Sequence, residues 1–204
     1  MFNLSMDSFC LSGLYISGRK KIKIVLAVSL VLLMSACGTT SGIKQQGDVV
    51  NEVDLTKYNV VVIKAFDDET KGNRLPIYAS NNFSDRITGA IRGKGTFEQV
   101  LREADFDPKE HEASNVMMLQ GAITRYQEGN AALKLWVGFG AGSTYFDAKV
   151  ELFDMLKGDS LGQIDVDRNS WALGGAIAAS QTVDQFMREA AEKVASELAK
   201  KRVQ

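Results

Sequence analysis

The sequence predicts an α+β domain, in which a mixed, mainly antiparallel sheet of about five strands carries two helices on one face. A β-branched run at 58–66 is typical of a buried strand. Apolar and polar residues alternate over 144–155 and a glycine-containing turn follows, which indicates a hairpin of long strands. Apolar residues recur every three or four positions from Val183 to Leu198, which indicates a long amphipathic helix.

The N-terminal part is organised like a secretory leader. Basic residues cluster over 19–23, and an uncharged apolar run extends from Ile24 to Ala36. This run is shorter than the ~20 apolar residues that a helix needs to cross a bilayer. It fits the apolar core of a signal peptide. An uncleaved N-terminal anchor is the alternative.

The apolar run ends in Leu33-Met34-Ser35-Ala36-Cys37, which resembles the lipobox of bacterial lipoproteins. The resemblance implies that Cys37 carries acyl chains such as palmitate and that residues 1–36 are removed. Lipoproteins kept at the inner membrane usually carry Asp directly after the cysteine, whereas Gly38 stands here. We therefore expect a lipid-anchored protein at the outer membrane that faces the periplasm.

The chain is expected to have three parts: a signal peptide (1–36), a lipidated N-terminus with a flexible tether (37–52) and one globular domain (53–204). The tether is expected because the residues after Cys37 are polar and rich in glycine. Cys10 lies in the leader and Cys37 carries lipid, so no cysteine remains for a disulfide, a metal site or a nucleophile.

In the first half of the domain, one helix is expected between strands. Ser80 is expected to cap a helix over 81–92, and Gly93 to follow its last turn. The other expected elements are a strand at 58–66, an acidic turn at 67–72, a short strand at 97–101 and a charged loop at 104–115.

In the second half, strands are expected at 116–126, with a bulge at Gly121, and at 132–139, 144–155 and 161–171. The third of these should point its more apolar face inward. That face consists of Phe146, Ala148, Val150, Leu152 and Asp154. Gly158 is expected to supply a positive φ in the hairpin turn. Thr182 to Gln185 fit a capping box at the start of the C-terminal helix.

A glycine-rich loop with flanking aromatic residues is the candidate interaction surface. Its residues are Trp136, Gly138, Phe139, Gly140, Gly142 and Tyr145. Aromatic residues beside an adaptable loop are common at interfaces. The alternative is a structural turn whose glycines permit positive φ or a close backbone approach.

No catalytic, cofactor or metal site is predicted. Glycines at 89–95 lack the spacing of a phosphate-binding loop, and they follow a helix instead of opening one. His111 is the only histidine. The chain has a net charge of −1. Cleavage of the leader would take its basic residues away, so the mature domain is expected to be more acidic. An acidic domain argues against nucleic acid as a partner. We also expect no nucleotide and no cofactor apart from lipid on Cys37.

Residues from about 58 to 198 resemble a family of uncharacterised bacterial lipoproteins that is known as a domain of unknown function. The resemblance is carried by Leu119–Tyr126, by Val137–Ser143, by Val150–Asp154 and by Gly158. It implies a GxGxG turn between two strands but no chemistry. We expect a non-catalytic binding or envelope-assembly module, with the membrane reached through the lipid anchor and an envelope protein as partner. A periplasmic hydrolase that uses carboxylates on glycan or peptide is the alternative.

Overall fold

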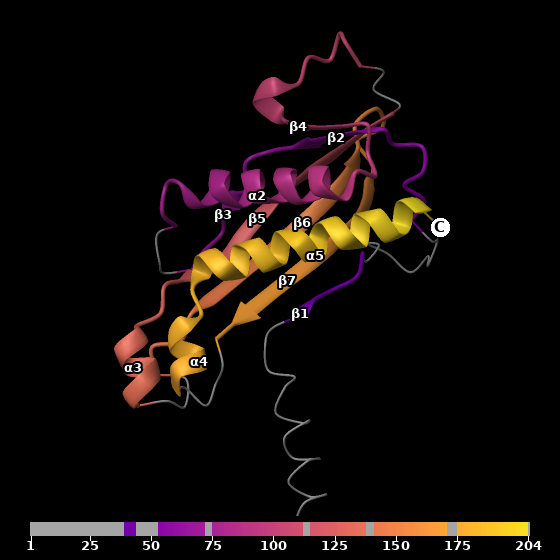
Figure 1. Cartoon of the computed structure of the whole chain (residues 1–204). Coiled ribbons are helices and arrows are strands. Elements are labelled where there is room, and N and C mark those ends of the chain that lie inside the picture. Colours follow the sequence, from indigo (N-terminus) through magenta and orange to yellow (C-terminus); the bar gives the residue numbers. More distant parts are fainter. Residues whose placement is uncertain are drawn as a thin grey trace, which may run out of the picture. The chain divides into compact units, whose positions relative to one another are not determined.

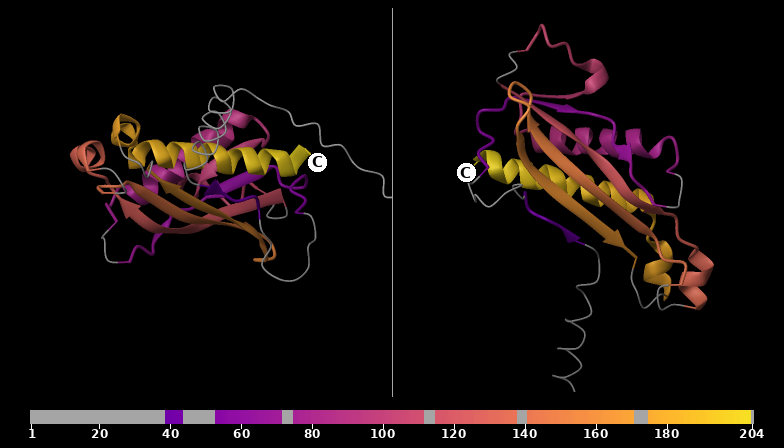
Figure 2. Two further views of the ribbon diagram at one scale, coloured as in Figure 1. Left: turned by 90° about the horizontal axis from the view of Figure 1, so that it is seen from below. Right: turned by 180° about the vertical axis from the view of Figure 1, so that it is seen from behind.

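A mixed seven-stranded sheet with two long helices on one face forms the framework of the domain (Figures 1 and 2). This computed structural model describes residues 39–43, 53–71, 75–111, 115–137, 141–170 and 175–203. The predicted α+β class is therefore confirmed. The elements are β1 (Thr39–Thr40), β2 (Val60–Ile63), β3 (Asp67–Asp68), α2 (Ala79–Lys94), β4 (Gln99–Arg102), a 3-10 turn (Glu103–Asp105), β5 (Val116–Gln127), α3 (Ala131–Trp136), β6 (Tyr145–Asp154), β7 (Ser160–Asn169), α4 (Gly175–Ser180) and α5 (Val183–Val203).

Strand β5 is where the sheet changes from antiparallel to parallel pairing. The strand order is β1-β7-β6-β5-β2-β4. On one side β5 runs antiparallel to β6, and β6 and β7 form the predicted hairpin. On the other side β5 runs parallel to β2, with Val60 opposite Val116, and then parallel to β3, with Asp67 opposite Ala122. β2 in turn pairs in parallel with β4. The two aspartates that the sequence placed in a turn, Asp67 and Asp68, thus form a short strand.

The core lies between the sheet and the two long helices, α2 and α5. In β6, Phe146 and the alternate residues after it are buried, as predicted. Phe83 of α2 packs edge-on against Phe66 and Phe146, with ring centroids 4.9 and 4.8 Å apart. Burial of aromatic and branched side chains of this kind is the main favourable contribution to folding.

The C-terminal helix α5 packs on the sheet through the face that the sequence predicted. Its buried residues include Val183, Phe186, Met187, Ala190, Ala191, Val194 and Leu198. The hydroxyl of Thr182 accepts the backbone N–H of Gln185 at 3.2 Å, so Thr182 is the expected N-cap. The amide of Gln185 donates to Glu189 at 2.8 Å, which leaves the reciprocal half of the capping box unformed.

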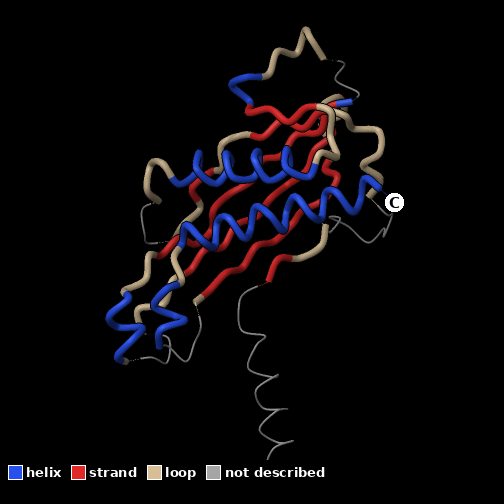
Figure 3. Tube along the Cα trace, viewed as in Figure 1, coloured by secondary structure: helices blue, strands red, loops and turns tan. Residues whose placement is uncertain are grey.

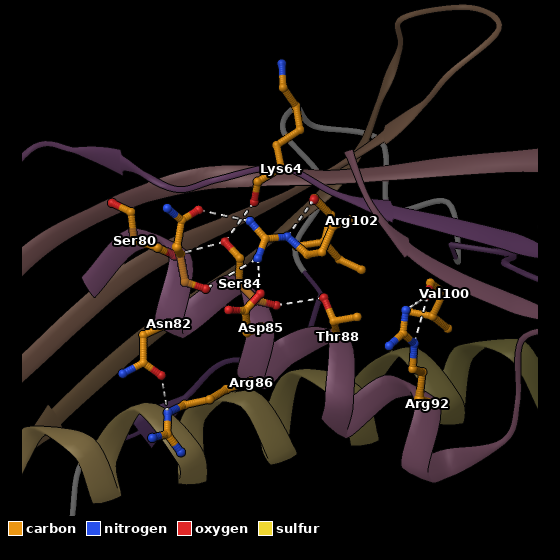
Figure 4. Close-up of polar contacts among 12 residues, drawn as sticks. Lys64, Ser80, Asn82, Ser84, Asp85, Arg86, Thr88, Arg92, Val100 and Arg102 are labelled. Carbon is orange, nitrogen blue, oxygen red and sulfur yellow. Dashed lines mark hydrogen bonds and ion pairs between the residues drawn. The ribbon is translucent and has the colours of Figure 1, made fainter. Parts of the chain in front are cut away.

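Arginine side chains connect α2 to the strands beside it (Figure 4). Arg92 of α2 donates from Nε and Nη2 to the carbonyl of Val100 in β4, at 2.9 and 2.6 Å. Arg102 of β4 forms an ion pair with Asp85 of α2 and donates to the carbonyl of Ile63 in β2 at 3.3 Å. Because Arg92 of α2 donates to a backbone carbonyl of β4 and Asp85 of α2 pairs with Arg102, these two contacts fix the position of α2 along β4.

Helix α2 is longer than the sequence predicted. Ser80 lies inside the first turn, and Tyr78 occupies the N-cap position without a side-chain hydrogen bond. Gly95, with φ of 63°, ends the helix in place of Gly93. Both glycines are able to adopt the left-handed conformation that ends a helix, and in the structure Gly95 adopts it.

The irregularity in β5 is also displaced from its predicted position. The register with β6 shifts between Ile123 and Arg125, not at Gly121. Gly121 has a different role: a Cβ built there would lie 1.9 Å from the carbonyl oxygen of Lys149. The glycine therefore permits a close approach of β5 and β6.

Part of the expected tether belongs to the sheet. Thr39 and Thr40 of β1 pair antiparallel with Asp167 and Val166 at the edge of β7, and the N–H of Ser41 donates to the carbonyl of Asp165 at 2.9 Å. This pairing satisfies backbone groups that an edge strand otherwise exposes. Residues 44–52 of the expected tether lie outside the described residues, and the predicted domain boundaries stay a prediction.

The carboxylate of Asp154, at the end of the inward face of β6, is buried with 3% of its surface exposed. It accepts the hydroxyl of Tyr58 at 2.8 Å, the ammonium of Lys57 at 2.9 Å and the N–H groups of Leu156 and Lys157 at 3.0 and 3.1 Å. Burial by itself would raise the pKa of Asp154. The hydrogen bonds from Lys57, Tyr58 and Lys157 outweigh burial and hold this pKa well below its ordinary value of 3.8.

We predict that Asp154→Asn lowers the free energy of unfolding at neutral pH by roughly 1–3 kcal/mol, because the donors lose their charged acceptor. The pKa of Asp154 is lower in the folded than in the unfolded chain, so the stabilisation is complete above about pH 4 and is lost as pH falls through the folded pKa. The difference in stability between wild type and variant should therefore stay constant between about pH 5 and pH 7 and shrink in more acidic solution.

Urea unfolding at a series of pH values measures this difference. Asp159→Asn is the matched control, because Asp159 is an exposed aspartate of the same hairpin turn. It should change stability little at any pH. A loss in Asp154→Asn that is independent of pH would contradict the role assigned to the charge.

Candidate functional site

The candidate site lies at the end of the sheet where β5 and β7 finish and β6 begins. Gln127 of β5 pairs with Tyr145 of β6, which pairs with Asn169 of β7. The two short helices α3 and α4 pack against each other beyond these strand ends (Figure 3). We call this part of the molecule, residues 129–137, 141–146 and 175–183, the α3–α4 end.

The sequence predicted a strand at 132–139. Helix α3 occupies most of the described part of this segment, so the prediction of a strand is wrong there. Alanine, leucine and lysine dominate the helix Ala131–Trp136 and favour this conformation. The side-chain oxygen of Asn130 accepts the N–H of Leu133 at 3.1 Å and caps the helix. Residues 138–140 lie outside the described residues.

Lys134 holds the α3–α4 end together from inside. It is 3% exposed, and its ammonium donates to the hydroxyl of Thr144 at 2.7 Å and to the carbonyl of Gln181 at 2.8 Å. The N–H of Thr144 in turn donates to Oγ of Ser170 at 3.0 Å. One lysine thus connects α3, the start of β6 and the link between α4 and α5. Both acceptors of the ammonium are neutral, and burial lowers the pKa of Lys134.

Apolar side chains of the α3–α4 end point to the outside. Trp136 is 84% exposed and Ile177 is 66% exposed. Leu133, Leu135 and Val137 are exposed as well. Several large apolar side chains exposed close together in a folded domain indicate a contact surface.

A cleft of about 280 Å³ lies beneath these helices. Its walls include Lys134, the hydroxyl-bearing Tyr78 and Tyr126, and the carboxylates of Glu128 and Asp184. Both tyrosine hydroxyls donate to the same oxygen of Glu128, at 3.4 and 3.1 Å. Burial, together with the neighbours Tyr78 and Glu128, raises the pKa of Tyr126. The cleft therefore offers two tyrosine hydroxyls, one buried ammonium and carboxylates to a ligand.

The structure separates the residues of the predicted interaction surface. Trp136 is exposed at the end of α3, and Gly142 packs beneath that helix. Tyr145 lies at the start of β6 with the guanidinium of Arg125 3.4 Å from its ring centre, a cation–π contact on the sheet. Gly138, Phe139 and Gly140 lie outside the described residues, as does Cys37.

Sequence reasoning missed Lys134, Ile177 and the cleft. A signal for Lys134 existed, because it is the only charged residue between positions 129 and 146. A lone charge in an apolar segment is either a buried, hydrogen-bonded group or a solvated one, and the sequence does not distinguish them. Ile177 carries no comparable signal.

Within the described residues, no three histidine, cysteine, aspartate or glutamate side chains gather as a metal site would require. The ring of His111 stacks on Phe106, with centroids 5.3 Å apart. None of the helices in the described ranges is long and apolar enough to cross a bilayer.

Comparison with known proteins identifies a family and a fold. A family model described as a domain of unknown function (DUF4410) matches residues 49–174. No curated protein shows significant sequence similarity to the chain. Among solved structures, the chain is similar to the PelC dodecamer from Paraburkholderia phytofirmans, with 16% identity and a TM-score of 0.53 over 79% of this chain and 96% of that one. This likeness shows a shared fold.

A weaker likeness is to lipoprotein GNA1162 from Neisseria meningitidis, with 12% identity and a TM-score of 0.42 over 69% of this chain and 98% of that one.

Gly142 provides a test of how α3 is held. It has a φ of 69°, and a Cβ built there would lie 2.7 Å from the carbonyl oxygen of Asn130 and 2.8 Å from Cβ of Leu133. Gly158 has nearly the same φ, 71°, but no atom within 4 Å of its Cβ position. Gly158→Ala should therefore cost only backbone strain, about 1–2 kcal/mol.

We predict that Gly142→Ala lowers the free energy of unfolding by a further ~1–3 kcal/mol beyond Gly158→Ala, because the methyl group overpacks against α3. Urea unfolding of the two variants measures both values. Equal losses would show that α3 does not pack on residue 142.

Proposed function

This chain belongs to the family described as a domain of unknown function (DUF4410), and from that premise we propose that it is a lipid-anchored, non-catalytic module of the bacterial envelope. Its anchor is acylated Cys37, and its place is the periplasmic side of the outer membrane. Its role is to bind or assemble with other envelope components.

One observation carries the proposal: the lipobox cysteine lies two residues before a strand of the folded domain. Cys37 ends the lipobox, and Thr39 already pairs with Asp167 in the sheet. Acyl chains on Cys37 would hold the domain at the bilayer surface, because each buried methylene contributes about 0.8 kcal/mol and two or more chains bind firmly.

The cleft beneath α3 and α4 is the surface that we propose for an envelope protein or another ligand. A photocrosslinking residue at position 131, which lines the cleft and is exposed, should give a crosslinked product in cells. The same residue at exposed position 159, in the hairpin turn at the other end of the sheet, should not. Equal products from both positions would remove the cleft from the proposal.

The hydrolase alternative would use the two carboxylates of the cleft. Glu128 already accepts the hydroxyls of Tyr78 and Tyr126, and Asp184 forms an ion pair with Arg86. Hydrolysis of a glycosidic bond needs a carboxylic acid and a second carboxylate on the two sides of that bond. Both carboxylates of the cleft already contact neighbouring side chains, and we propose the binding role in preference to hydrolysis.

We predict that Cys37→Ala blocks maturation of the chain. The variant should keep residues 1–36 and respond to no inhibitor of signal peptidase II, because the acylated cysteine is the substrate of the cleavage. Intact-mass spectrometry of the membrane fraction measures this. Cys10→Ala is the matched control and should mature and acquire lipid as the wild type does. Normal maturation of Cys37→Ala would refute the proposed anchor.

A second substitution tests the membrane. Gly38→Asp should move the lipidated protein from the outer to the inner membrane fraction in density-gradient separation, whereas Gly38→Ser should leave it in the outer one. Lipidated wild-type protein in the inner membrane fraction would contradict the outer-membrane assignment and leave the anchor intact.

A further inference from the structure

We propose that the α3–α4 end rests on the bilayer that holds the lipid anchor, with Trp136 and Ile177 among the lipid headgroups. The inference rests on the proposed anchor at Cys37. It assigns a lipid surface, not a protein, as the occupant of the exposed apolar side chains. Three independent features of the chain lead to it.

The first feature is the direction in which the chain leaves the sheet. Thr39 pairs with Asp167, two residues before β7 ends at Asn169, and β1 runs antiparallel to β7. Going back from Thr39 toward Cys37, the chain therefore heads for the end of the sheet that carries α3 and α4. Two residues span at most about 7 Å. We therefore expect an acylated sulfur two residues before Thr39 nearer this end of the sheet than the β6–β7 turn.

The second feature is the absence of exposed charge from the sequence of the α3–α4 end. Charged residues make up 24% of the chain. The α3–α4 end, residues 129–137, 141–146 and 175–183, contains one, Lys134, and that ammonium is buried and hydrogen-bonded to Thr144 and Gln181. Burying the single cation removes the group that would be costly to bring among acyl chains.

The third feature is the kind of side chain that is exposed. Trp136 and Ile177 project from two helices that pack against each other, together with Leu133, Leu135 and Val137. Tryptophan favours the interface between headgroups and acyl chains, where its ring is buried and its N–H stays hydrated. Short helices with apolar exposed faces are suited to lie in this interface.

The opposite end of the sheet differs. The β6–β7 turn carries Lys157 and Asp159, both exposed. It also exposes Leu156, which is 61% accessible and provides a matched control position. A residue at 156 should stay in water when the domain rests on its α3–α4 end.

The test uses the full chain, matured and lipidated in cells, purified and reconstituted into phosphatidylcholine vesicles with brominated acyl chains. Trp171→Phe leaves Trp136 as the only tryptophan. Its fluorescence should lose more than half of its intensity relative to unbrominated vesicles, and its emission should shift to shorter wavelength. In the control Trp136→Phe/Trp171→Phe/Leu156→Trp, the intensity should not change. Should Trp171→Phe fail to fold, the emission of Trp136 is obtained by subtracting the spectrum of Trp136→Phe from that of the wild type.

Each outcome decides between the proposals. Protein that floats with the vesicles but shows unquenched Trp136 emission overturns the lipid contact and leaves the anchor standing. Blue-shifted Trp136 emission that bromine does not quench, and whose blue shift decreases when the protein is diluted, assigns the surface to a second copy of the chain. This outcome also overturns the lipid contact. Protein that does not float refutes the anchor itself. Equal quenching at positions 136 and 156 overturns the proposed orientation.

Discussion

The pairing of Thr39 and Thr40 with the edge of β7 is the interaction on which the placement of this protein depends. A lipidated cysteine followed by a long tether would let the domain take any orientation above the membrane. A cysteine two residues before a paired strand removes this freedom. In the proposed arrangement the anchor sets which end of the sheet meets the bilayer, so the register of one short strand would determine the surface that contacts lipid. The edge of β7, which would otherwise expose backbone donors and acceptors, is covered by the same contact.

Lys134 makes the α3–α4 end compatible with that position. Its ammonium ties α3 to the start of β6 and to the link before α5, and its two acceptors, Thr144 and Gln181, are neutral. Burial removes hydration free energy from the charged form of Lys134, and its pKa is lowered for this reason. The same contacts fix to the sheet two short helices that could not be stable alone. Their outward faces are left without charge, and the cleft beneath them is lined both by Lys134 and by the carboxylate of Glu128, which accepts tyrosine hydroxyls.

Much of the fold could be predicted because its signals are periodic. The buried faces of β6 and α5 and the turn at Gly158 follow directly from alternation, from helical spacing and from the need for a positive φ. The strand expected at 132–139 was wrong. The six residues of α3 are too few for their periodicity to distinguish a helix from a strand, and the side-chain cap from Asn130 favours the helix. The end of α2 was misplaced by two residues because Gly93 and Gly95 carry the same local signal, and the left-handed conformation is adopted at Gly95. The local sequence also does not predict the candidate site. The exposed position of Trp136 and the burial of Lys134 result from packing between segments far apart in the chain. The pairing of β1 with β7 is likewise a contact between distant segments.

The depth of two spin labels in the membrane tests the account most directly. Ile177→Cys and Leu156→Cys each add one labelling site to the mature chain, in which Cys37 carries the proposed acyl chains, and both positions are exposed. Power-saturation electron paramagnetic resonance of the lipidated protein on vesicles compares collisions with oxygen, which concentrates among acyl chains, and with a water-soluble nickel chelate. We predict that the label at 177 collides mainly with oxygen and the label at 156 mainly with nickel. A label at 177 that is as accessible to nickel as the label at 156 would contradict it.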